Sequence, residues 1–240
     1  MSQCNTGKPL AWAILAGLIS MRLSALHVCL ERSGRIIVND LSFAVGAGEM
    51  LIITGANGAG KSTLLRALAG LLPLSAGKIS CDGLKNDRTL AMQAHYLGHL
   101  DALKTALTAQ ENLEFWADMG EGGISPRAAL AKLALAHVAE FPVGYLSAGQ
   151  KRRVALARLL VARRPVWLLD EPTTALDALS QAMFAGLVRA HLAGGGLVVA
   201  ATHAPLEIEG ARELRLGPVA LASWPAQTGP SQIQPAGSLP

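Results

Sequence analysis

Short apolar runs alternate along this chain with longer stretches in which apolar residues recur at helical spacing. The short runs predict strands at 23–30, 35–45, 50–54, 77–83, 166–169 and 196–201, with a further strand ending at 96–99. The longer stretches predict helices at 63–69, from 108 onward, and at 125–140, 147–164 and 177–192. This alternation predicts an α/β fold with a mostly parallel, doubly wound sheet, whose site lies at the carboxyl ends of the strands.

The middle of the chain carries the start and stop signals of helices. Thr108 and Glu111 have the spacing of a capping box. Ser125 precedes a proline at the first helical position, and Pro165 would end the last helix of this region. We therefore expect a helical part at about 100–160 within an otherwise alternating chain.

Composition narrows the range of partners. Of the 240 residues, 51% are hydrophobic and only 16% are charged, which favours a large protein–protein surface. The formal net charge is +4 and aromatic residues make up 4%, so the chain lacks the basic field and the stacking platform of a nucleic-acid binder. No uninterrupted apolar run reaches the ~18 residues of a membrane span, and we expect any membrane role to act through a partner.

One glycine-rich segment carries the strongest chemical signal. It fits the phosphate-binding pattern G-x-x-x-x-G-K-[ST] at every fixed position and lies between a predicted strand and a predicted helix. The glycines let backbone amides curl around an anion, and the helix start adds a partial positive charge. We expect Lys61 to reach the β- and γ-phosphates of ATP and Ser62 to bind Mg²⁺. The predicted nucleotide-binding residues here are Gly55, Ala56, Asn57, Gly58, Ala59, Gly60, Lys61, Ser62 and Thr63.

A second signal is the apolar run 166–169, which ends in two acids, Asp170 and Glu171. Taken alone, it would indicate a buried strand followed by a solvated acidic turn. Beside a phosphate-binding loop, Asp170 is instead predicted to hold Mg²⁺, directly or through water, as the acidic partner of Ser62. Glu171 is then placed to polarise the attacking water as a general base.

The third motif is the segment Leu146-Ser147-Ala148-Gly149-Gln150. With the first two motifs it closely resembles the ATP-binding subunits of ABC transporters, whose signature is L-S-G-G-Q; Ala148 departs from that pattern. The resemblance implies a RecA-like core, an antiparallel β subdomain and an inserted helical subdomain. It also implies a head-to-tail homodimer, in which Ser147, Gly149 and Gln150 bind the ATP held by the other subunit. A hydroxyl and free amides at a helix start suit such an anion.

The same resemblance assigns two further residues. Asp177 matches the loop that crosses the dimer interface of the family. His203, after the predicted strand 196–201, matches the histidine that contacts the γ-phosphate. With Lys61 and Glu171, His203 completes the predicted catalytic set.

Two positions depart from the family's pattern. His99 stands where the family has a glutamine, after the strand that ends near residue 97. We assign His99 to Mg²⁺ in place of that glutamine, or to signalling toward a partner. The aromatic residue that stacks on adenine is absent near Arg32 and Arg35, whose guanidinium planes can stack instead. We expect weak selectivity for the nucleotide base.

Within the ABC class, the chain resembles the cytochrome c maturation ATPases, the CcmA family, over about residues 22–216. The segments that carry this resemblance are 96–99, 103–116, 146–158 and 167–172. It implies ATP hydrolysis coupled to heme export or to release of a heme-loaded periplasmic chaperone. It also implies integral membrane permease subunits as partners and a peripheral place on the cytoplasmic face of the bacterial inner membrane.

Two other functions stay open on the sequence. The chain could serve an ABC transporter of another substrate, or be a soluble ABC-type ATPase that acts on nucleic acid. Proteins of the second kind usually carry long coiled-coil insertions or two tandem ATPase units, and this sequence has one phosphate-binding loop. We expect a single ATPase domain at 21–225. Residues 1–20 resemble the apolar part of a signal peptide, and we interpret them as an extension before a true or functional start at Met21, with a membrane-touching extension as the alternative. We interpret residues 226–240 as a flexible tail.

Overall fold

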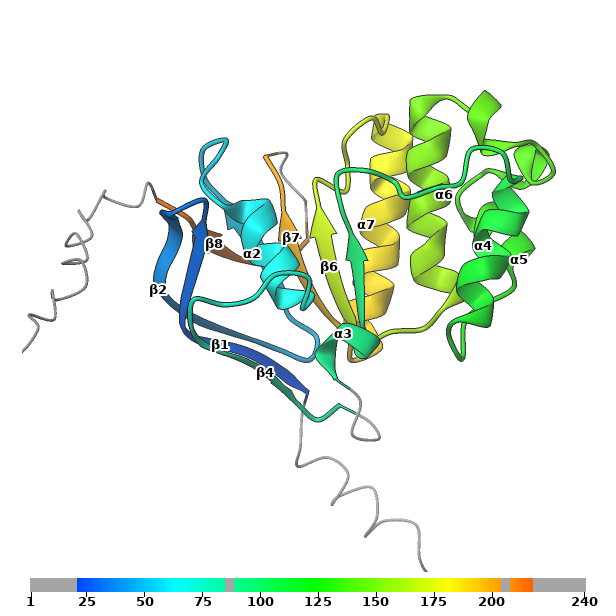
Figure 1. The fold of residues 1–240 in the computed structure, drawn as a ribbon. Helices are drawn as coiled ribbons and strands as arrows, with labels where there is room; N and C mark the ends of the chain where they lie inside the picture. The colour runs from blue at the N-terminus through cyan, green and yellow to red at the C-terminus, as the bar shows by residue number, and fades with distance from the viewer. Residues whose placement is uncertain (1–20, 85–88, 204–207, 218–240) are drawn as a thin grey trace, which may run out of the picture.

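The computed structural model describes residues 21–84, 89–203 and 208–217, and its strands form two sheets (Figure 1). An antiparallel sheet has the order β2-β1-β4, and a parallel sheet has the order β5-β6-β7-β3-β8. The predicted α/β class is confirmed, with the antiparallel sheet beside the core. The strands are β1 Arg22–Arg32, β2 Arg35–Gly46, β3 Met50–Thr54, β4 Ala76–Asp82, β5 Ala94–Leu97, β6 Val166–Asp170, β7 Leu197–Ala201 and β8 Arg212–Arg215. The helices are α2 Lys61–Leu68, α3 Leu90–Gln93, α4 Ala109–Asp118, α5 Pro126–Lys132, α6 Ala148–Val161 and α7 Ala178–Ala193, with short 3₁₀ turns η1 Ala136–Val138 and η2 Val143–Tyr145.

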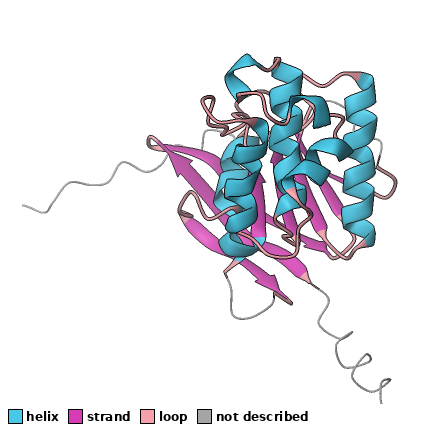
Figure 2. Cartoon of the chain, turned by 90° about the vertical axis from the view of Figure 1, so that its right-hand side faces the viewer, coloured by secondary structure: helices cyan, strands magenta, loops and turns pink. Residues whose placement is uncertain are grey.

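The parallel sheet is covered on both faces, as Figure 2 shows for the helices in front of its strands. Side chains of a strand alternate between the two faces. Leu168 and Val199 belong to the core shared with α2 and the antiparallel sheet. Their neighbours Leu169 and Ala200 belong to the core shared with α4, α5, α6 and α7. Because both faces are apolar, β6 and β7 are continuous hydrophobic runs that carry the polar site only where they end.

The helical part consists of α4, α5 and α6, which pack against one another. Its first helix begins as predicted. The Thr108 hydroxyl accepts from the amide of Glu111 at 3.1 Å, and the Glu111 carboxylate accepts from the amide of Thr108 at 2.8 Å. This capping box orders the entry of the chain into α4.

Two predicted helix ends were wrong. α5 ends at Lys132 rather than near residue 140, because the chain turns at Ala134 (φ 55°) and thereby buries both Leu133 and Leu135 completely. One face of a straight helix could not bury both, since residues two apart point in different directions. α6 ends at Val161, three residues before the predicted end, because Ala162 adopts an extended conformation and bridges to residue 122.

Arginines from the region of α6 reach β5, the edge strand of the parallel sheet. They donate hydrogen bonds to backbone carbonyls at alternate positions: Arg164 to Ala94 at 2.8 Å, Arg158 to Tyr96 at 2.8 Å and Arg152 to Gly98 at 3.1 Å. Arg158 also lies over the ring of Trp116, 4.4 Å from its centroid. α6 and the residues that follow it are therefore linked to β5 and to the residue after β5.

Some predicted segments lie in parts of the chain that the structure does not describe, and some described elements were not predicted. The extension 1–20 and the tail 226–240 lie outside the described residues. Three described elements, α3, the 3₁₀ turn η2 and β8, were not predicted. β8 has the sequence Arg-Glu-Leu-Arg and only one partly buried side chain, so its pairing with β3 has no apolar pattern to reveal it.

Candidate active site

The phosphate-binding loop joins the carboxyl end of β3 to the first turn of α2. Gly60 is the N-cap of α2, with φ 96°, a conformation that residues with a side chain rarely adopt. A Cβ atom at this position would lie 2.5 Å from Cγ2 of Ile37 on β2. Position 60 therefore requires glycine for its backbone and for its packing. The first amides of α2 have no acceptor within the helix and are free for an anion.

Lys61 folds back over this loop and is only 8% exposed. Its Nζ donates to the carbonyls of Gly55 at 2.8 Å and Ala56 at 3.1 Å, and it lies 3.0 Å from Nε2 of His203. An ammonium group has only donors, so Nε2 of His203 accepts in this contact. The loop thus holds a positive charge against neutral acceptors beside a helix start.

Ser62 and Asp170 meet across the end of the sheet. The Ser62 hydroxyl donates to Oδ1 of Asp170 at 3.0 Å. Asp170 is 3% exposed, and its Oδ2 is buried without a hydrogen-bond partner among the described residues. A buried carboxylate oxygen is costly to leave without a partner. Hydroxyl and carboxylate oxygens are ligands that Mg²⁺ prefers, so this pair fits a Mg²⁺ ion shared with nucleotide phosphates.

Glu171 follows Asp170 in a left-handed backbone conformation, with φ 48°. Its amide donates to the carbonyl of Ala201 at 2.8 Å, which joins it to the end of β7. One carboxylate oxygen lies 3.7 Å from Nε2 of His203, and the other accepts from the amide of His203 at 3.4 Å. A left-handed residue with a side chain costs about 1–2 kcal/mol, so neighbouring contacts hold it in place. Glu171, His203 and Lys61 are brought together from three different strand ends.

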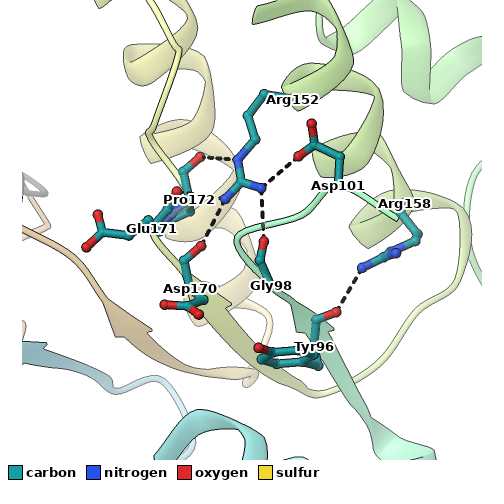
Figure 3. Close-up of polar contacts among 8 residues, drawn as sticks. All are labelled: Tyr96, Gly98, Asp101, Arg152, Arg158, Asp170, Glu171 and Pro172. Atoms are coloured by element: carbon teal, nitrogen blue, oxygen red, sulfur yellow. Dashed lines mark hydrogen bonds and ion pairs between the residues drawn. The ribbon is translucent and has the colours of Figure 1, made fainter. Parts of the chain in front are cut away.

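Sequence reasoning missed one residue that contacts this site, Arg152 of α6. It is 3% exposed, and its guanidinium group reaches the backbone of Asp170 and Glu171 (Figure 3). The sequence feature that could have revealed this contact is helical spacing, because Arg152 shares a helix face with the buried residues Ala155 and Leu159. A charged residue on an inward face indicates a buried polar contact.

The signature residues lie at the exposed start of α6. Ser147 is the N-cap: its hydroxyl accepts from the amide of Gln150 at 3.2 Å, and the Gln150 side chain accepts from the amide of Ser147 at 2.9 Å. A Cβ atom on Gly149 would lie 2.9 Å from the carbonyl oxygen of Ala175. Gly149 therefore permits close packing between the signature segment and the loop that leads to Asp177.

Asp177 caps α7, because its carboxylate accepts from the amide of Ser180 at 2.7 Å. Hydrogen bonds from Ser180 lower the pKa of Asp177 below its usual value, so this exposed group stays ionised at neutral pH. Among the described residues, the hydrogen bond that the Asp177 carboxylate accepts comes from α7, the helix that it caps.

His99 follows β5 and is exposed. Among the described residues, no hydrogen bond or ion pair joins it to Ser62 or Asp170. The structure thus brings together two of the three predicted metal ligands, and the role of His99 stays a prediction.

Known proteins resemble the chain along most of its length. The profile of the ABC transporter family matches residues 38–174. The cytochrome c biogenesis ATP-binding export protein CcmA of Nitrobacter winogradskyi is 56% identical over 198 residues, which cover 82% of this chain and 98% of that protein. The CcmA protein of Rhodopseudomonas palustris strain HaA2 is 54% identical over 201 residues, which cover 83% of this chain and all of that protein.

Solved structures resemble the same region. A bacterial Atm1-family ABC exporter with ATP bound superimposes with a TM-score of 0.70 at 27% identity, over 82% of this chain and 37% of the exporter chain. A putative ABC transporter ATP-binding protein from Pyrococcus furiosus has a TM-score of 0.69 at 20% identity, over 81% of this chain and 97% of its own, and shows the shared fold. From the family match and the identity to these relatives, the chain belongs to the CcmA family of ABC transporter ATP-binding proteins.

Proposed function

We propose that this ATPase serves cytochrome c biogenesis and couples ATP hydrolysis to heme export or to release of a heme-loaded periplasmic chaperone. As a member of the ABC family, the chain binds and hydrolyses ATP. The observation that carries the proposal is its similarity to proteins named for cytochrome c biogenesis over nearly their whole length.

Nucleotide binding follows from the loop and the first turn of α2. We infer that the phosphates of ATP accept from the free amides at this helix start. Lys61 exchanges the carbonyls of Gly55 and Ala56 for the β- and γ-phosphates, a stronger pairing because both partners are charged. Ser62 and Asp170 would hold Mg²⁺, which when bound neutralises phosphate charge during transfer. The unpartnered Oδ2 of Asp170 supports this assignment.

Glu171 and His203 are the proposed groups for hydrolysis. In this scheme the Glu171 carboxylate orients a water molecule and takes its proton as the water attacks the γ-phosphate. His203, whose Nε2 lies 3.0 Å from Nζ of Lys61 and 3.7 Å from Glu171, contacts the γ-phosphate. Its place between Lys61 and Glu171 supports this role, because Lys61 is proposed to bind the γ-phosphate and Glu171 to orient the water that attacks it.

The proposed active unit is a head-to-tail homodimer with two ATP molecules. Support comes from the start of α6: Ser147 is exposed, and Gly149 packs against the loop that leads to Asp177. The start of a helix can bind an anion. Because this helix start faces solvent, the anion would be the ATP held by the other subunit. Hydrolysis would remove the γ-phosphate that bridges the two subunits and let them separate.

The chain is a component of a transporter, and family membership implies membrane-embedded partners. Within the part of the chain that the structure describes, no helix is both long and apolar enough to cross a bilayer. We propose integral membrane permease subunits as those partners, with this subunit on the cytoplasmic face of the bacterial inner membrane. The segment 99–105 is the proposed contact; its Leu100 is 81% exposed.

The deciding experiment measures covalent heme on c-type cytochromes in cells that carry Glu171→Gln in place of the natural chain. The expected result is loss of the heme signal while apocytochrome is still made. Glu140→Gln, an exposed glutamate in the helical part, is the matched control and should leave the signal intact. An unchanged signal in a stably expressed Glu171→Gln strain, with ATP hydrolysis by the purified variant shown to be lost, would refute the cytochrome role and favour a transporter of another substrate.

A further inference from the structure

Arg152 connects three parts of the molecule that the proposed mechanism treats separately. It lies near the start of α6, and its side chain leaves the helical part and enters the core (Figure 3). The guanidinium group makes one hydrogen bond for each of its five N–H donors. The acceptors are the carbonyls of Pro172 at 3.2 Å, Asp170 at 3.0 Å, Glu171 at 2.7 Å and Gly98 at 3.1 Å, and the carboxylate of Asp101 at 2.8 Å.

Three of these acceptors are consecutive carbonyls that surround the strained residue. Glu171 has φ 48°, and such a conformation persists only where its surroundings fix it. One planar guanidinium group that binds the carbonyls before, at and after this position fixes the peptide planes on both sides of it. The Glu171 side chain points away from Arg152, so Arg152 acts on its backbone and leaves the carboxylate free (Figure 3).

The other two acceptors lie in the segment after β5. Gly98 and Asp101 flank His99 and Leu100, which are exposed. The Arg152 side chain is 4% exposed and that of Asp101 is 26% exposed, so this ion pair is partly shielded from water. Removing one member of such a pair leaves the other with an uncompensated charge.

The neighbouring arginines do not share this arrangement. Arg158 and Arg164 donate to carbonyls of β5 itself, and among the described residues neither makes a hydrogen bond to the end of β6. Arg152 alone of the three joins the signature helix, the segment after β5 and the proposed base.

We propose that Arg152 is a positioning residue for ATP hydrolysis: it fixes the backbone at 170–172 so that the Glu171 carboxylate faces the nucleotide. Through Asp101 it links this geometry to the segment 98–101. The inference rests on the proposed function, in which Glu171 is the general base. Because Arg152 touches backbone behind the site, it should affect turnover and leave the affinity for ATP unchanged.

The test uses the full chain and measures kcat and KM for ATP, nucleotide binding and thermal unfolding. Arg152→Gln is expected to lower kcat at least ~10-fold, since small misplacements of a catalytic group are costly, while KM stays within about 3-fold. Arg152→Lys retains the charge and three donors and should restore part of the lost kcat. Arg152→Gln combined with Asp101→Asn should be no slower than Arg152→Gln, because loss of Arg152 already removes the contact through which Asp101 acts.

Arg164→Gln is the matched control, since it removes the same kind of arginine–carbonyl contact at the opposite end of β5. It should leave kcat unchanged. An unchanged kcat in Arg152→Gln would overturn the inference. So would a parallel loss of kcat, nucleotide binding and thermal stability that Arg152→Lys does not restore. If Arg152→Gln fails to fold, Arg152→Lys carries the test, with kcat lowered at least ~3-fold at constant KM.

Glu171→Gln, assayed alongside, separates this inference from the proposed function. Normal turnover in Glu171→Gln would refute the assignment of the base. Lost turnover in Glu171→Gln together with normal turnover in Arg152→Gln would refute only the role of Arg152.

Discussion

His95 should make the protein less stable in weak acid. The imidazole is 2% exposed, and its Nε2 donates to the carbonyl of Ala162 at 2.6 Å. Burial, with the nearby charges of Arg164 and Arg158, lowers its pKa from 6.5 to about 3. Below pH 6.5, His95 therefore binds a proton in the unfolded chain but not in the folded chain. Stability from this group is complete above pH 6.5 and is lost as the pH falls toward 3.

The size of the effect follows from these two pKa values. Between pH 7.5 and pH 5.0, protonation of the unfolded state lowers the free energy of unfolding by about 2 kcal/mol. Urea unfolding followed by circular dichroism at both pH values measures this loss. His95→Gln can still donate to Ala162 and does not titrate, so its loss over this range should be about 2 kcal/mol smaller than that of the natural chain. His137→Gln, at an exposed histidine of η1, should behave like the natural chain. An equal loss in His95→Gln would refute the reasoning.

Three further changes test the site. Gly60→Ala places a Cβ atom 2.5 Å from Cγ2 of Ile37 in a left-handed residue, and it should weaken ATP binding at least ~10-fold in a filter-binding assay; unchanged affinity would contradict the loop geometry. Ser147→Ala removes the cap shared with Gln150 and should lower the free energy of urea unfolding by about 1 kcal/mol, whereas Ser147→Asn, which can cap, should not. Asp170→Asn should keep nucleotide binding without Mg²⁺ and abolish Mg²⁺-dependent turnover in a Mg²⁺ titration; an unaltered titration curve would exclude Asp170 as a ligand.

The parts of the fold that sequence could predict are those fixed by local rules. The strands β6 and β7 are buried on both faces, so each is a continuous apolar run with a clear end. Thr108 and Ser147 begin their helices as predicted because a capping box requires only residues three apart. The loop before Lys61 was recognisable since its chemistry depends on the order of its own residues.

The parts that sequence could not predict depend on distant partners. α5 has an alanine-rich sequence that favours a longer helix, but burial of Leu133 and Leu135 in the shared core overrides this propensity. The contacts of Arg152 run to residues on β6 and after β5, which are near only once the chain has folded. Similarly, the pairing of β8 with β3 needs the rest of the sheet.

The arginines along β5 have a consequence for aggregation. An open edge strand presents unpaired backbone groups on which a strand from another molecule can add, and repeated addition produces insoluble assemblies. Here the carbonyls of Ala94, Tyr96 and Gly98 are already occupied by guanidinium groups. Such occupancy matters in a chain with 51% hydrophobic residues, where partly unfolded molecules adhere readily. These arginines, which link α6 and the residues after it to the core, thereby also occupy acceptors that a strand of a neighbouring molecule would need in order to pair with this edge.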